Sequence, residues 1–401
     1  MIEEGVCLFI FRSQLVSLLN SFNGSELILK ILKQSLLPTL LFSACVLSFS
    51  TPVLAQLPAD GQSACDADPS LPICDFLRDN TTRPSPSQNA PPTQNADDHT
   101  MVKLTQTGPA GSRDFYLYIP QALQTPTTHA APLFVMLHGC TQSPMEFAAA
   151  TGMNAQADAR SFVVIYPEQT SQYNALGCWN WFATDNQARS GETELIAMMV
   201  TTAASKVNID LNQVYLVGFS AGAAMASNLL ACYGDIFAAG AIHSGLTYDA
   251  AEGETDGALA MQDGSTKNLD DVAKRAIKCD PLPRKTSRLI IFQGSQDSTV
   301  APVNAQQIVT TFKKVDELAS GTGSANNWKI AGRKIPSADH QFDAKVSDHY
   351  LNGDLKIESI LIDNMDHAWS GGSSSQSYTQ PSSLNATSAI TGFFLDAKPA
   401  N

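Results

Sequence analysis

The stretch VYLVGFSAGAAMASNLLA, residues 214–231, joins an apolar segment to an alanine-rich segment through a G-x-S-x-G motif. The first four residues favour a buried strand, and the run from Ala221 favours a helix. A tight turn between such elements holds its central serine in a strained conformation with the hydroxyl exposed, and the flanking glycines let the two backbones approach. The motif alone is a weak signal, so its meaning comes from this context. We therefore expect Ser220 to lie on a sharp strand-to-helix turn as a candidate nucleophile.

Strands and helices alternate on both sides of this motif. Apolar segments predict strands over residues 133–137, 162–166, 214–219, 238–242 and 289–292. Helices are expected over residues 145–159, 192–207, 221–231, 303–315 and 383–395. Turns at 108–111 and 352–353 predict two hairpins, the second joining strands 346–351 and 355–362. Apolar strands separated by helices are typical of an α/β fold with a mostly parallel central sheet and helices on both faces.

Composition and charge exclude several classes of protein. Charged residues make up 16% of the chain, against about a quarter in typical proteins. The formal net charge is −13, whereas nucleic acids and anionic lipids require a basic patch on their partner. No heptad run or repeat of the solenoid type is present in the sequence. Nucleic-acid binding, fibres and solenoids are therefore not expected.

The first 55 residues have the features of a leader. Lys30 and Lys33 precede an apolar stretch over 36–49, and small residues then lead to Ala55. This pattern predicts a secretory signal peptide cleaved after Ala55, an extracellular or periplasmic protein, and no stable membrane anchor after cleavage. A membrane span is the alternative, but the stretch is short for one. A lipoprotein site at Cys45 is disfavoured because the apolar run continues beyond it.

Two further regions follow the leader. Residues 56–100 contain Cys65, Cys74 and a stretch over 80–95 rich in Pro, Ser, Gln and Asn, which is typical of a linker. Residues 101–401 are expected to form one catalytic domain.

The cysteines fit an exported protein. Six remain once Cys7 and Cys45 are assigned to the leader, and these are Cys65, Cys74, Cys140, Cys178, Cys232 and Cys279. In an oxidising compartment an even number predicts disulfide bonds, and six cysteines allow 15 pairings, among which the sequence alone does not choose. A zinc site is disfavoured because no Cys or Cys/His cluster has ligand spacing. No metal is expected.

A serine nucleophile needs a base to take its proton and an acid to orient the base. In the α/β-hydrolase arrangement the acid and then the histidine follow the serine along the chain, on loops after later strands. Asp297 follows the strand over 289–292, and His367 follows the strand over 355–362. We therefore expect Ser220, Asp297 and His367 to form a catalytic triad.

The rival residues are placed less well for catalysis. For the base they are His99, His129, His138, His243, His340 and His349. His138 ends a strand and is expected to be hydrogen-bonded rather than catalytic. For the acid the rivals are Asp363 and Asp366, which are expected to be solvated or to contact the histidine loop.

An oxyanion needs two backbone N–H groups already aimed at it. Ala221 follows the nucleophile and should supply one. Gly139 allows a sharp exit from the strand over 133–137, so the N–H of Cys140 is the candidate for the other. The alternative is an ordinary glycine turn at the end of that strand.

Five motifs in order along the chain resemble the polyhydroxybutyrate depolymerase branch of the serine esterases, whose neighbours include feruloyl and acetyl xylan esterases. The motifs are LHGCTQ (137–142), GCWNWF (177–182), VGFSAGAAMA (217–226), DSTVAP (297–302) and HAWSGG (367–372). The resemblance covers residues 101–396. It implies an α/β-hydrolase fold, a triad of Ser220, Asp297 and His367, and an oxyanion N–H from Cys140.

The sequence departs from the pattern of this family in two places. The loop before the acid usually reads H-G-x-x-D, but here it carries Gln293-Gly294, which leaves the acid intact and removes a histidine of unknown role. Secreted polymer-degrading members carry a separate substrate-binding domain after the catalytic one, and this chain ends soon after His367. We therefore expect activity on amorphous polymer or soluble oligomers and little on crystalline polymer.

The resulting hypothesis is a secreted serine esterase that hydrolyses polyhydroxybutyrate through an acyl-enzyme, without metal or organic cofactor. One alternative is a carbohydrate esterase of the feruloyl or acetyl xylan type, and another is a non-catalytic polymer-binding protein on the same fold. Trp179, Trp181 and Trp369 either line an acyl groove or belong to the core.

The cysteines of the LHGC and GCWNWF motifs should lie on loops that meet at the rim of the site. We therefore predict a Cys140–Cys178 disulfide that fixes the oxyanion loop. Cys232–Cys279 and Cys65–Cys74 are then the remaining pairs.

Overall fold

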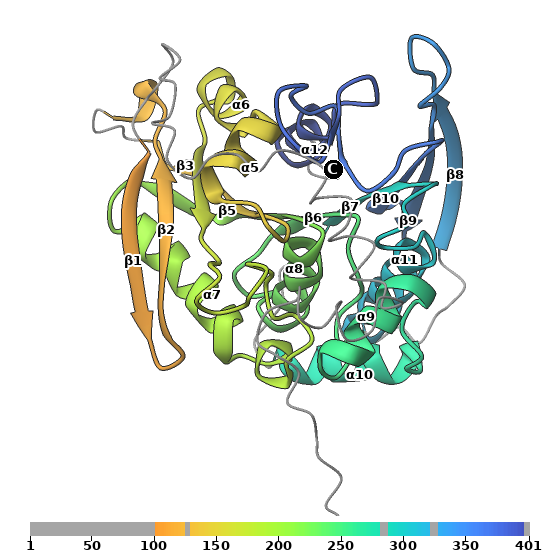
Figure 1. Ribbon diagram of the computed structural model, residues 1–401, viewed down its shortest axis with the longest axis horizontal. Helices are drawn as coiled ribbons and strands as arrows, with labels where there is room; N and C mark the ends of the chain where they lie inside the picture. The colour runs from red at the N-terminus through yellow and green to blue at the C-terminus, as the bar shows by residue number, and fades with distance from the viewer. Residues whose placement is uncertain (1–100, 125–128, 281–287, 321–327, 397–401) are drawn as a thin grey trace, which may run out of the picture. The chain divides into compact units, whose positions relative to one another are not determined.

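The computed structural model describes residues 101–124, 129–280, 288–320 and 328–396 (Figure 1). The predicted leader over residues 1–55, the predicted linker region over 56–100 and the predicted Cys65–Cys74 bond lie outside these residues. No helix in the part that is described combines the length and the apolar character needed to cross a bilayer.

The described strands form one large sheet of ten members in the order β1-β2-β4-β3-β5-β6-β7-β10-β9-β8. The six strands from β4 to β10 in that order run parallel, and the hairpins at both sides are antiparallel. The bounds are β1 Val102–Gly108, β2 Gly111–Tyr118, β3 Ala131–Leu137, β4 Val163–Pro167, β5 Ile209–Phe219, β6 Ala239–His243, β7 Arg288–Gly294, β8 Trp328–Ile335, β9 Ala344–Leu351 and β10 Asp354–Ile362. The expected α/β fold, with its mostly parallel sheet, is confirmed.

Helices cover both faces of the sheet (Figure 1). On one face lie α5 Pro144–Thr151, α6 Met153–Arg160 and α12 Ala386–Leu395. On the other face lie α7 Gly191–Ala204, α8 Ala221–Cys232, α9 Glu254–Asp263, α10 Leu269–Cys279 and α11 Val303–Ala319. The single helix expected over 145–159 is divided in two, because Gly152 adopts a left-handed φ of 65° that ends α5.

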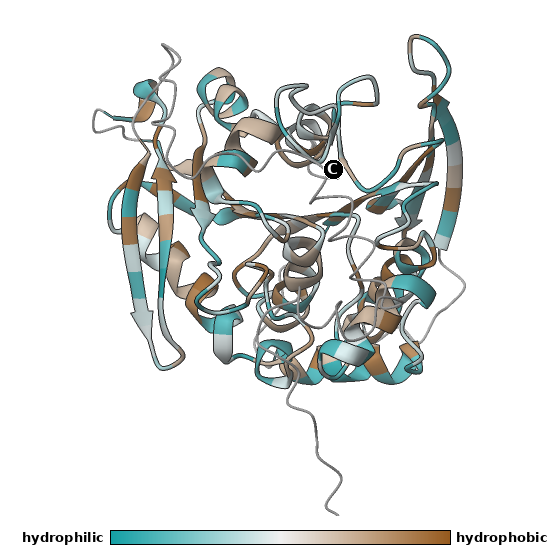
Figure 2. Cartoon of the chain, in the orientation of Figure 1, coloured by the Kyte–Doolittle hydropathy of each residue, from teal (hydrophilic) through white to brown (hydrophobic). Residues whose placement is uncertain are grey.

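The core has two layers that share the central strands. On β3, Leu133, Val135 and Leu137 point into the layer beneath α7 and α8. Phe134 and Met136 point into the layer beneath α5, α6 and α12. Figure 2 shows the apolar residues gathered along the strands and the inner sides of the helices. Burial on both faces explains why these strands are continuously apolar in sequence.

The edge strand β8 was not predicted from the sequence. Six of its eight residues are exposed, and its sequence WKIAGRKI lacks the apolar alternation of a half-buried strand. It is ordered by its antiparallel pairing with β9.

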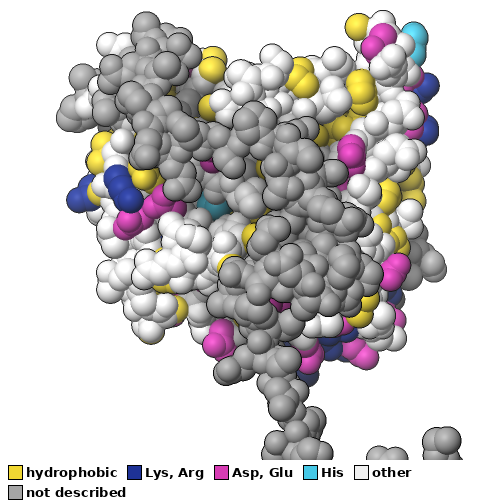
Figure 3. All heavy atoms as spheres, in the orientation of Figure 1, with side chains coloured by type: hydrophobic (Ala, Val, Ile, Leu, Met, Phe, Trp, Pro, Cys, Tyr) yellow, Lys and Arg dark blue, Asp and Glu magenta, His cyan; other side chains and the backbone are white. Residues whose placement is uncertain are grey.

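On the face of the described residues shown in Figure 3, Lys and Arg side chains form small separate groups near acidic ones.

Two of the predicted disulfides are present in the described residues. Cys140 is bonded to Cys178, and Cys232 is bonded to Cys279. The first joins the loop after β3 to the loop that follows β4. The second joins the carboxyl ends of α8 and α10.

The glycines of the G-x-S-x-G motif generate a prediction about stability. A Cβ at Gly222 would lie 2.2 Å from the carbonyl oxygen of Leu137, so Gly222→Ala must push α8 away from β3. We expect a loss of about 1–3 kcal/mol in the free energy of unfolding, measured by urea denaturation. Gly332→Ala in β8 is the control, because the nearest atom would be 3.9 Å away. Equal stability of the two variants would contradict the packing argument.

Candidate active site

The structure brings together the three residues predicted to form the triad. The Nε2 atom of His367 lies 2.9 Å from Ser220 Oγ. The Nδ1 atom of His367 lies 2.9 Å from Asp297 Oδ2 and 3.1 Å from Oδ1. The three side chains come from the turn between β5 and α8, the loop after β7, and the loop between β10 and β11 (Trp369–Ser370). A single hydrogen-bonded chain therefore runs from a hydroxyl to a carboxylate.

The turn that carries Ser220 has the strained geometry expected of it. Ser220 adopts φ 55° and ψ −122°, in the left-handed region that non-glycine residues rarely occupy. Its N–H donates to the carbonyl of His243 at 3.0 Å. A Cβ at Gly218 would lie 2.3 Å from the carbonyl oxygen of Gly222, so both glycines are required by the close approach of strand and helix.

Asp297 is buried and receives several hydrogen bonds. The N–H groups of Thr299 and Val300 donate to Oδ1 at 3.0 and 2.8 Å. Burial disfavours the charged carboxylate, but the charge and hydrogen bond of His367, the Val300 N–H and the Ser244 hydroxyl outweigh it. The pKa of Asp297 is consequently below its usual range. Asp297 is thus held as an acceptor facing the histidine.

Gln293 shows what replaces the histidine that the family pattern places before the acid. Its side chain is buried, and its Nε2 donates to Asp297 Oδ2 at 3.1 Å and to the carbonyl of Val300 at 2.9 Å. A non-titrating amide therefore supports the acid in this chain. The departure from the H-G-x-x-D pattern was the sequence signal, but the contact itself required the fold.

The loops that carry Asp297 and His367 are bonded to each other. The N–H of Ser295 donates to Ile362 O, and the N–H of Gln296 donates to Met365 O, both at 2.9 Å. A Cβ at Gly294 would lie 2.2 Å from Met365 O. Because β7 and β10 are parallel neighbours, their carboxyl ends place these two loops side by side.

The oxyanion candidates lie next to the serine. A Cβ on Gly139 would be 3.3 Å from the Cβ of Ser220, so the loop after β3 passes directly beside it. This loop is fixed by the Cys140–Cys178 bond and by the Thr141 N–H, which donates to Leu176 O at 2.7 Å. Within the described residues, neither the N–H of Cys140 nor that of Ala221 donates to a protein acceptor.

The rival histidines have other positions. His138 is buried, donates from Nδ1 to Gly139 O at 2.8 Å and accepts from the Gln169 N–H at 3.1 Å. His243 is buried behind the site, His340 lies beside Asp343, and His349 is in β9. His129 is exposed, and His99 lies outside the described residues.

The rival acids are bound elsewhere. Asp363 pairs with Lys345 at 2.5 Å. Asp366 accepts from the N–H of His367 at 2.8 Å and so contacts the histidine loop without touching the imidazole.

The three tryptophans belong to the core, which was one of the two alternatives. Trp179, Trp181 and Trp369 are 0%, 5% and 1% exposed. Trp369 stacks on His243 with ring centroids 4.9 Å apart and packs edge-on against Phe147. Their side chains are therefore packed within the core rather than exposed along an open groove.

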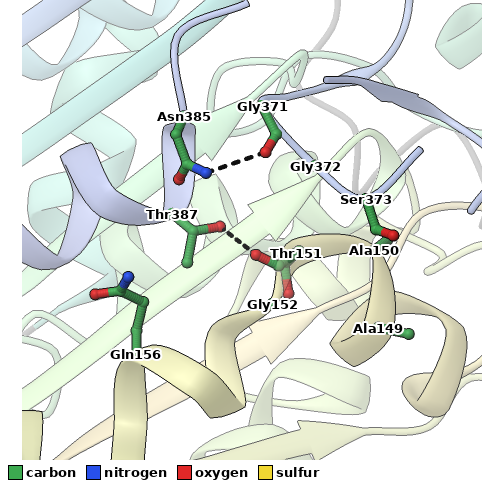
Figure 4. A pocket seen from close by; sticks show the side chains of 10 residues that line it. All are labelled: Ala149, Ala150, Thr151, Gly152, Gln156, Gly371, Gly372, Ser373, Asn385 and Thr387. Atoms are coloured by element: carbon green, nitrogen blue, oxygen red, sulfur yellow. Dashed lines mark hydrogen bonds between the residues drawn. The ribbon is translucent and has the colours of Figure 1, made fainter. Parts of the chain in front are cut away.

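A small pocket of about 240 Å³ lies between α5, α6, the loop after β11 and α12 (Figure 4). Asn385 donates to Gly371 O at its edge, and Thr387 donates to Thr151 O. None of Ser220, Asp297 and His367 lines it. In the part of the chain that is described, no group of three His, Cys, Asp or Glu side chains is arranged to hold a metal ion.

The structure has six parallel strands with helices on both faces, a serine on the turn after β5, and an acid and a histidine on later loops. These features define an α/β-hydrolase fold. The chain belongs to the esterase family described as Esterase PHB depolymerase, whose model matches residues 114–332, just over half of the chain.

Similar proteins include enzymes named for different esters. The chain is 34% identical over 217 residues to a poly(3-hydroxyalkanoate) depolymerase C of Paucimonas lemoignei, covering 53% of this chain and 50% of that protein. It is 29% identical over 210 residues to a feruloyl esterase B of Thermothelomyces thermophilus, covering 50% of this chain and 69% of that protein. It therefore spans half the length of the depolymerase relative.

A solved structure agrees on the fold. The acetyl xylan esterase from Aspergillus awamori superposes with a TM-score of 0.54 at 22% sequence identity, covering 67% of this chain and 94% of that one.

The buried histidines generate a prediction about pH. Burial lowers the pKa of His138 to about 4, and this effect outweighs a hydrogen bond to Gly139 O that raises the pKa. Burial and then the charge of His367 lower the pKa of His243 to about 3. Each value is below the unfolded one of about 6.5, so the unfolded chain binds more protons below that pH and stability falls on acidification. The loss should approach about 1.4 kcal/mol per pH unit for each histidine at about pH 5.

This loss can be measured by urea unfolding at a series of pH values from about 7 to 4.5. In His243→Gln the free energy of unfolding should fall less steeply with decreasing pH than in the wild type, because one of the two buried histidines no longer contributes. His138→Gln should behave similarly. A slope that neither substitution changes would show that these rings are not kept neutral by the fold.

Proposed function

We propose that the protein is a secreted serine esterase that hydrolyses 3-hydroxybutyrate esters, in polyhydroxybutyrate or its soluble oligomers. The observation that carries the proposal is the continuous hydrogen-bonded chain from Ser220 Oγ through His367 to Asp297. A serine hydroxyl bonded to an imidazole that is itself oriented by a buried carboxylate is the arrangement that activates a serine nucleophile.

In the proposed reaction Ser220 Oγ attacks the ester carbonyl carbon while His367 Nε2 takes its proton. Asp297 holds the imidazole and stabilises the imidazolium that forms. The tetrahedral intermediate collapses when His367 returns the proton to the leaving alcohol oxygen, which leaves an acyl-enzyme on Ser220. Water then attacks the acyl carbon while His367 Nε2 takes its proton. The bond between the acyl carbon and Ser220 Oγ breaks as His367 returns that proton to Oγ, and the carboxylic acid departs.

The negative oxygen of each tetrahedral intermediate requires donors that are in place beforehand. The N–H groups of Cys140 and Ala221 are the proposed donors. They are supported by their lack of protein acceptors among the described residues and by the position of the Gly139 backbone beside Ser220. The disulfide at Cys140 would limit movement of its N–H during the reaction.

The choice of ester rests on similarity. The family model and the 34% identical depolymerase relative favour a polyhydroxybutyrate-type substrate. The feruloyl esterase relative makes a carbohydrate esterase the second candidate. A complete hydrogen-bonded triad counts against a non-catalytic polymer-binding protein.

Export is supported by the two disulfides, because such bonds persist in oxidising compartments. An extracellular or periplasmic location follows from the predicted signal peptide, which would be cleaved after Ala55.

The enzyme proposal is tested with a short-chain p-nitrophenyl ester. Wild-type protein should hydrolyse it, and Ser220→Ala should lower kcat by a factor that approaches ~10⁶, because the nucleophile is lost. Ser265→Ala, which removes a buried hydroxyl bonded to Ala250 O, is the matched control and should retain activity. No turnover by the wild type would refute the esterase proposal.

The substrate proposal is tested with a panel of amorphous polyhydroxybutyrate, 3-hydroxybutyrate oligomers, methyl ferulate and acetylated xylan. We expect the highest kcat/KM on the oligomers and release of 3-hydroxybutyrate from the polymer. A kcat/KM on methyl ferulate or acetylated xylan about tenfold above that on the oligomers, or 1.4 kcal/mol in transition-state binding, would favour the carbohydrate-esterase alternative.

The two disulfides should differ in their effect on catalysis. Their sequence separations are 38 and 47 residues, so replacing either pair by serines should cost a similar amount of stability, about 3–4 kcal/mol. Only the Cys140→Ser, Cys178→Ser variant should also lower kcat in protein that remains folded, because it frees a proposed oxyanion donor. The Cys232→Ser, Cys279→Ser variant is the control, and equal kcat values in the two would count against this role.

A further inference from the structure

Glu192 is a buried carboxylate that the proposed mechanism does not use. It lies in the first turn of α7 and is 5% exposed. Arg113 of β2 pairs with it, with Nη2 2.9 Å from Oε1, and is itself 7% exposed. Both charges are therefore removed from water, and such a pair is stable only where further hydrogen bonds satisfy its remaining atoms.

The further donors to Glu192 come from the segment between β4 and α7. Gln169 Nε2 donates to Oε1 at 2.6 Å. Asn180 donates from its backbone N–H to Oε2 and from its Nδ2 to Oε1, both at 2.9 Å. Asn186 Nδ2 donates to Oε2 at 3.3 Å. Residues 168–190 contain no strand or α-helix, so this carboxylate holds together a segment with little regular structure.

A chain of hydrogen bonds leads from Glu192 to the loop after β3. Gln169, whose side chain binds Glu192, donates its backbone N–H to Nε2 of His138 at 3.1 Å. Nδ1 of His138 donates to the carbonyl of Gly139 at 2.8 Å. The imidazole is 0% exposed and packs beside Trp179, with ring centroids 5.6 Å apart. The ring is therefore fixed through both of its nitrogens.

These contacts assign the protons of His138. A backbone N–H can only donate and a carbonyl can only accept, so Nε2 carries the lone pair and Nδ1 carries the proton. Burial lowers the pKa of His138 to about 4, so the ring is neutral and keeps this tautomer at neutral pH. The imidazole therefore holds the Gly139 carbonyl in one direction.

The Gly139 carbonyl and the Cys140 N–H belong to one planar peptide unit, which is trans. The two groups point in opposite directions, so a contact that fixes the carbonyl also fixes the N–H. This N–H is one of the proposed oxyanion donors. Gly139 lies next to the nucleophile, since a Cβ on it would be 3.3 Å from the Cβ of Ser220. The direction of the proposed donor therefore depends on His138.

The segment bound by the buried carboxylate also holds the loop after β3 from its other side. Leu176 O accepts from the Thr141 N–H at 2.7 Å, and Cys178 is bonded to Cys140. Gln169 Nε2 donates to the carbonyl of Cys178 at 3.1 Å. The disulfide fixes a side chain, whereas the backbone contacts fix the direction of the peptide. Displacement of the segment would therefore turn the proposed donor.

We propose that Glu192 is a positioning residue for the oxyanion donor: it holds the segment before α7 in place, and Gln169 and His138 transmit this restraint to the peptide that carries the donor. The proposal rests on the esterase function proposed above. Glu192 would contact neither the substrate nor the reacting atoms. Its loss should weaken binding of the transition state, which lowers kcat, and leave KM nearly unchanged.

The first experiment compares Glu192→Gln with the wild type on a p-nitrophenyl ester. The amide keeps the shape of the side chain, loses its charge and turns an NH₂ group toward other donors. We expect kcat to fall about 10- to 100-fold with KM nearly unchanged, less than the roughly 10²–10³-fold loss when an oxyanion donor is removed outright. Wild-type kcat in folded Glu192→Gln would overturn the proposal.

Asp235→Asn is the matched control for the loss of an ion pair. Asp235 Oδ1 lies 2.6 Å from Nη1 of Arg189, which also donates to Cys232 O beside the other disulfide. The substitution removes a partly buried carboxylate that has no printed link to the loop after β3, and it should keep wild-type kcat. A loss equal to that in Glu192→Gln would show that breaking any such pair has this effect, and it would count against the proposal.

Three further variants test the chain, also where Glu192→Gln does not fold. Gln169→Leu removes the side-chain donor and leaves the Arg113–Glu192 pair intact, and it should lower kcat in the same way. His138→Phe keeps a buried ring without a donor for the Gly139 carbonyl, whereas His138→Asn places an amide donor near the former Nδ1. We expect His138→Asn to retain more of kcat than His138→Phe. Equal losses in these two, or wild-type kcat in folded Gln169→Leu, would overturn the proposed chain.

A further readout separates a misplaced oxyanion donor from a general loss of active protein. In a thionoester the carbonyl oxygen is replaced by sulfur, a weak hydrogen-bond acceptor that gains little from oxyanion donors. The ratio of kcat/KM for the ester to that for its thionoester should fall about tenfold in Glu192→Gln and stay at the wild-type value in Asp235→Asn. A merely structural carboxylate would lower both rates equally, so an unchanged ratio would overturn the proposal.

The final measurement does not require turnover. Amide hydrogen exchange reports local opening, and the Thr141 N–H is protected by its bond to Leu176 O. Residues 138–143 should exchange faster in Glu192→Gln than in the wild type or Asp235→Asn. Faster exchange in a protein whose wild type has no ester turnover would refute the esterase function and leave the coupling to this loop intact. Unchanged exchange in an active enzyme would refute the coupling alone.

Discussion

The close approach of backbones at the carboxyl ends of β5, β7 and β10 is the constraint on which the site depends. At Gly222 a side chain would overlap the carbonyl of Leu137, and at Gly294 it would overlap that of Met365. These two contacts seat the serine turn against β3 and the acid loop against the histidine loop. The hydrogen bonds among Ser220, His367 and Asp297 are possible only because the three loops are fixed at this spacing.

The sequence predicted most of this site, because each of its residues follows an apolar strand in a fixed order along the chain. The parallel sheet, both hairpins and the pairing of Cys140 with Cys178 were likewise predictable. The contact of Gln293 with Asp297 was not, because it depends on the conformation of the loop that follows β7. The tryptophans were ambiguous for a related reason: aromatic residues near a motif suit a groove and a core equally well.

The electrostatics of the site combine one buried charge with several neutral supports. Gln293 donates to Asp297 without carrying charge, and His138 and His243 are held neutral by burial. Charge near the nucleophile is therefore concentrated on Asp297 and on the His367 imidazolium that forms in the proposed reaction. Dipoles that are fixed before the reaction need no reorganisation when a negative oxygen forms, which is the main source of rate enhancement in such sites.

The exposed edge strand β8 has a consequence for how the molecule behaves at high concentration. An open edge presents unpaired N–H and C=O groups to other chains, and proteins commonly protect such edges with charged side chains. β8 carries Lys329, Arg333 and Lys334, and Arg333 bonds to Asp348 on the neighbouring strand β9 and to Glu358 on β10, the strand after it. Two such edges would bring like charges together, so this border of the sheet resists the strand-to-strand stacking that begins amyloid growth.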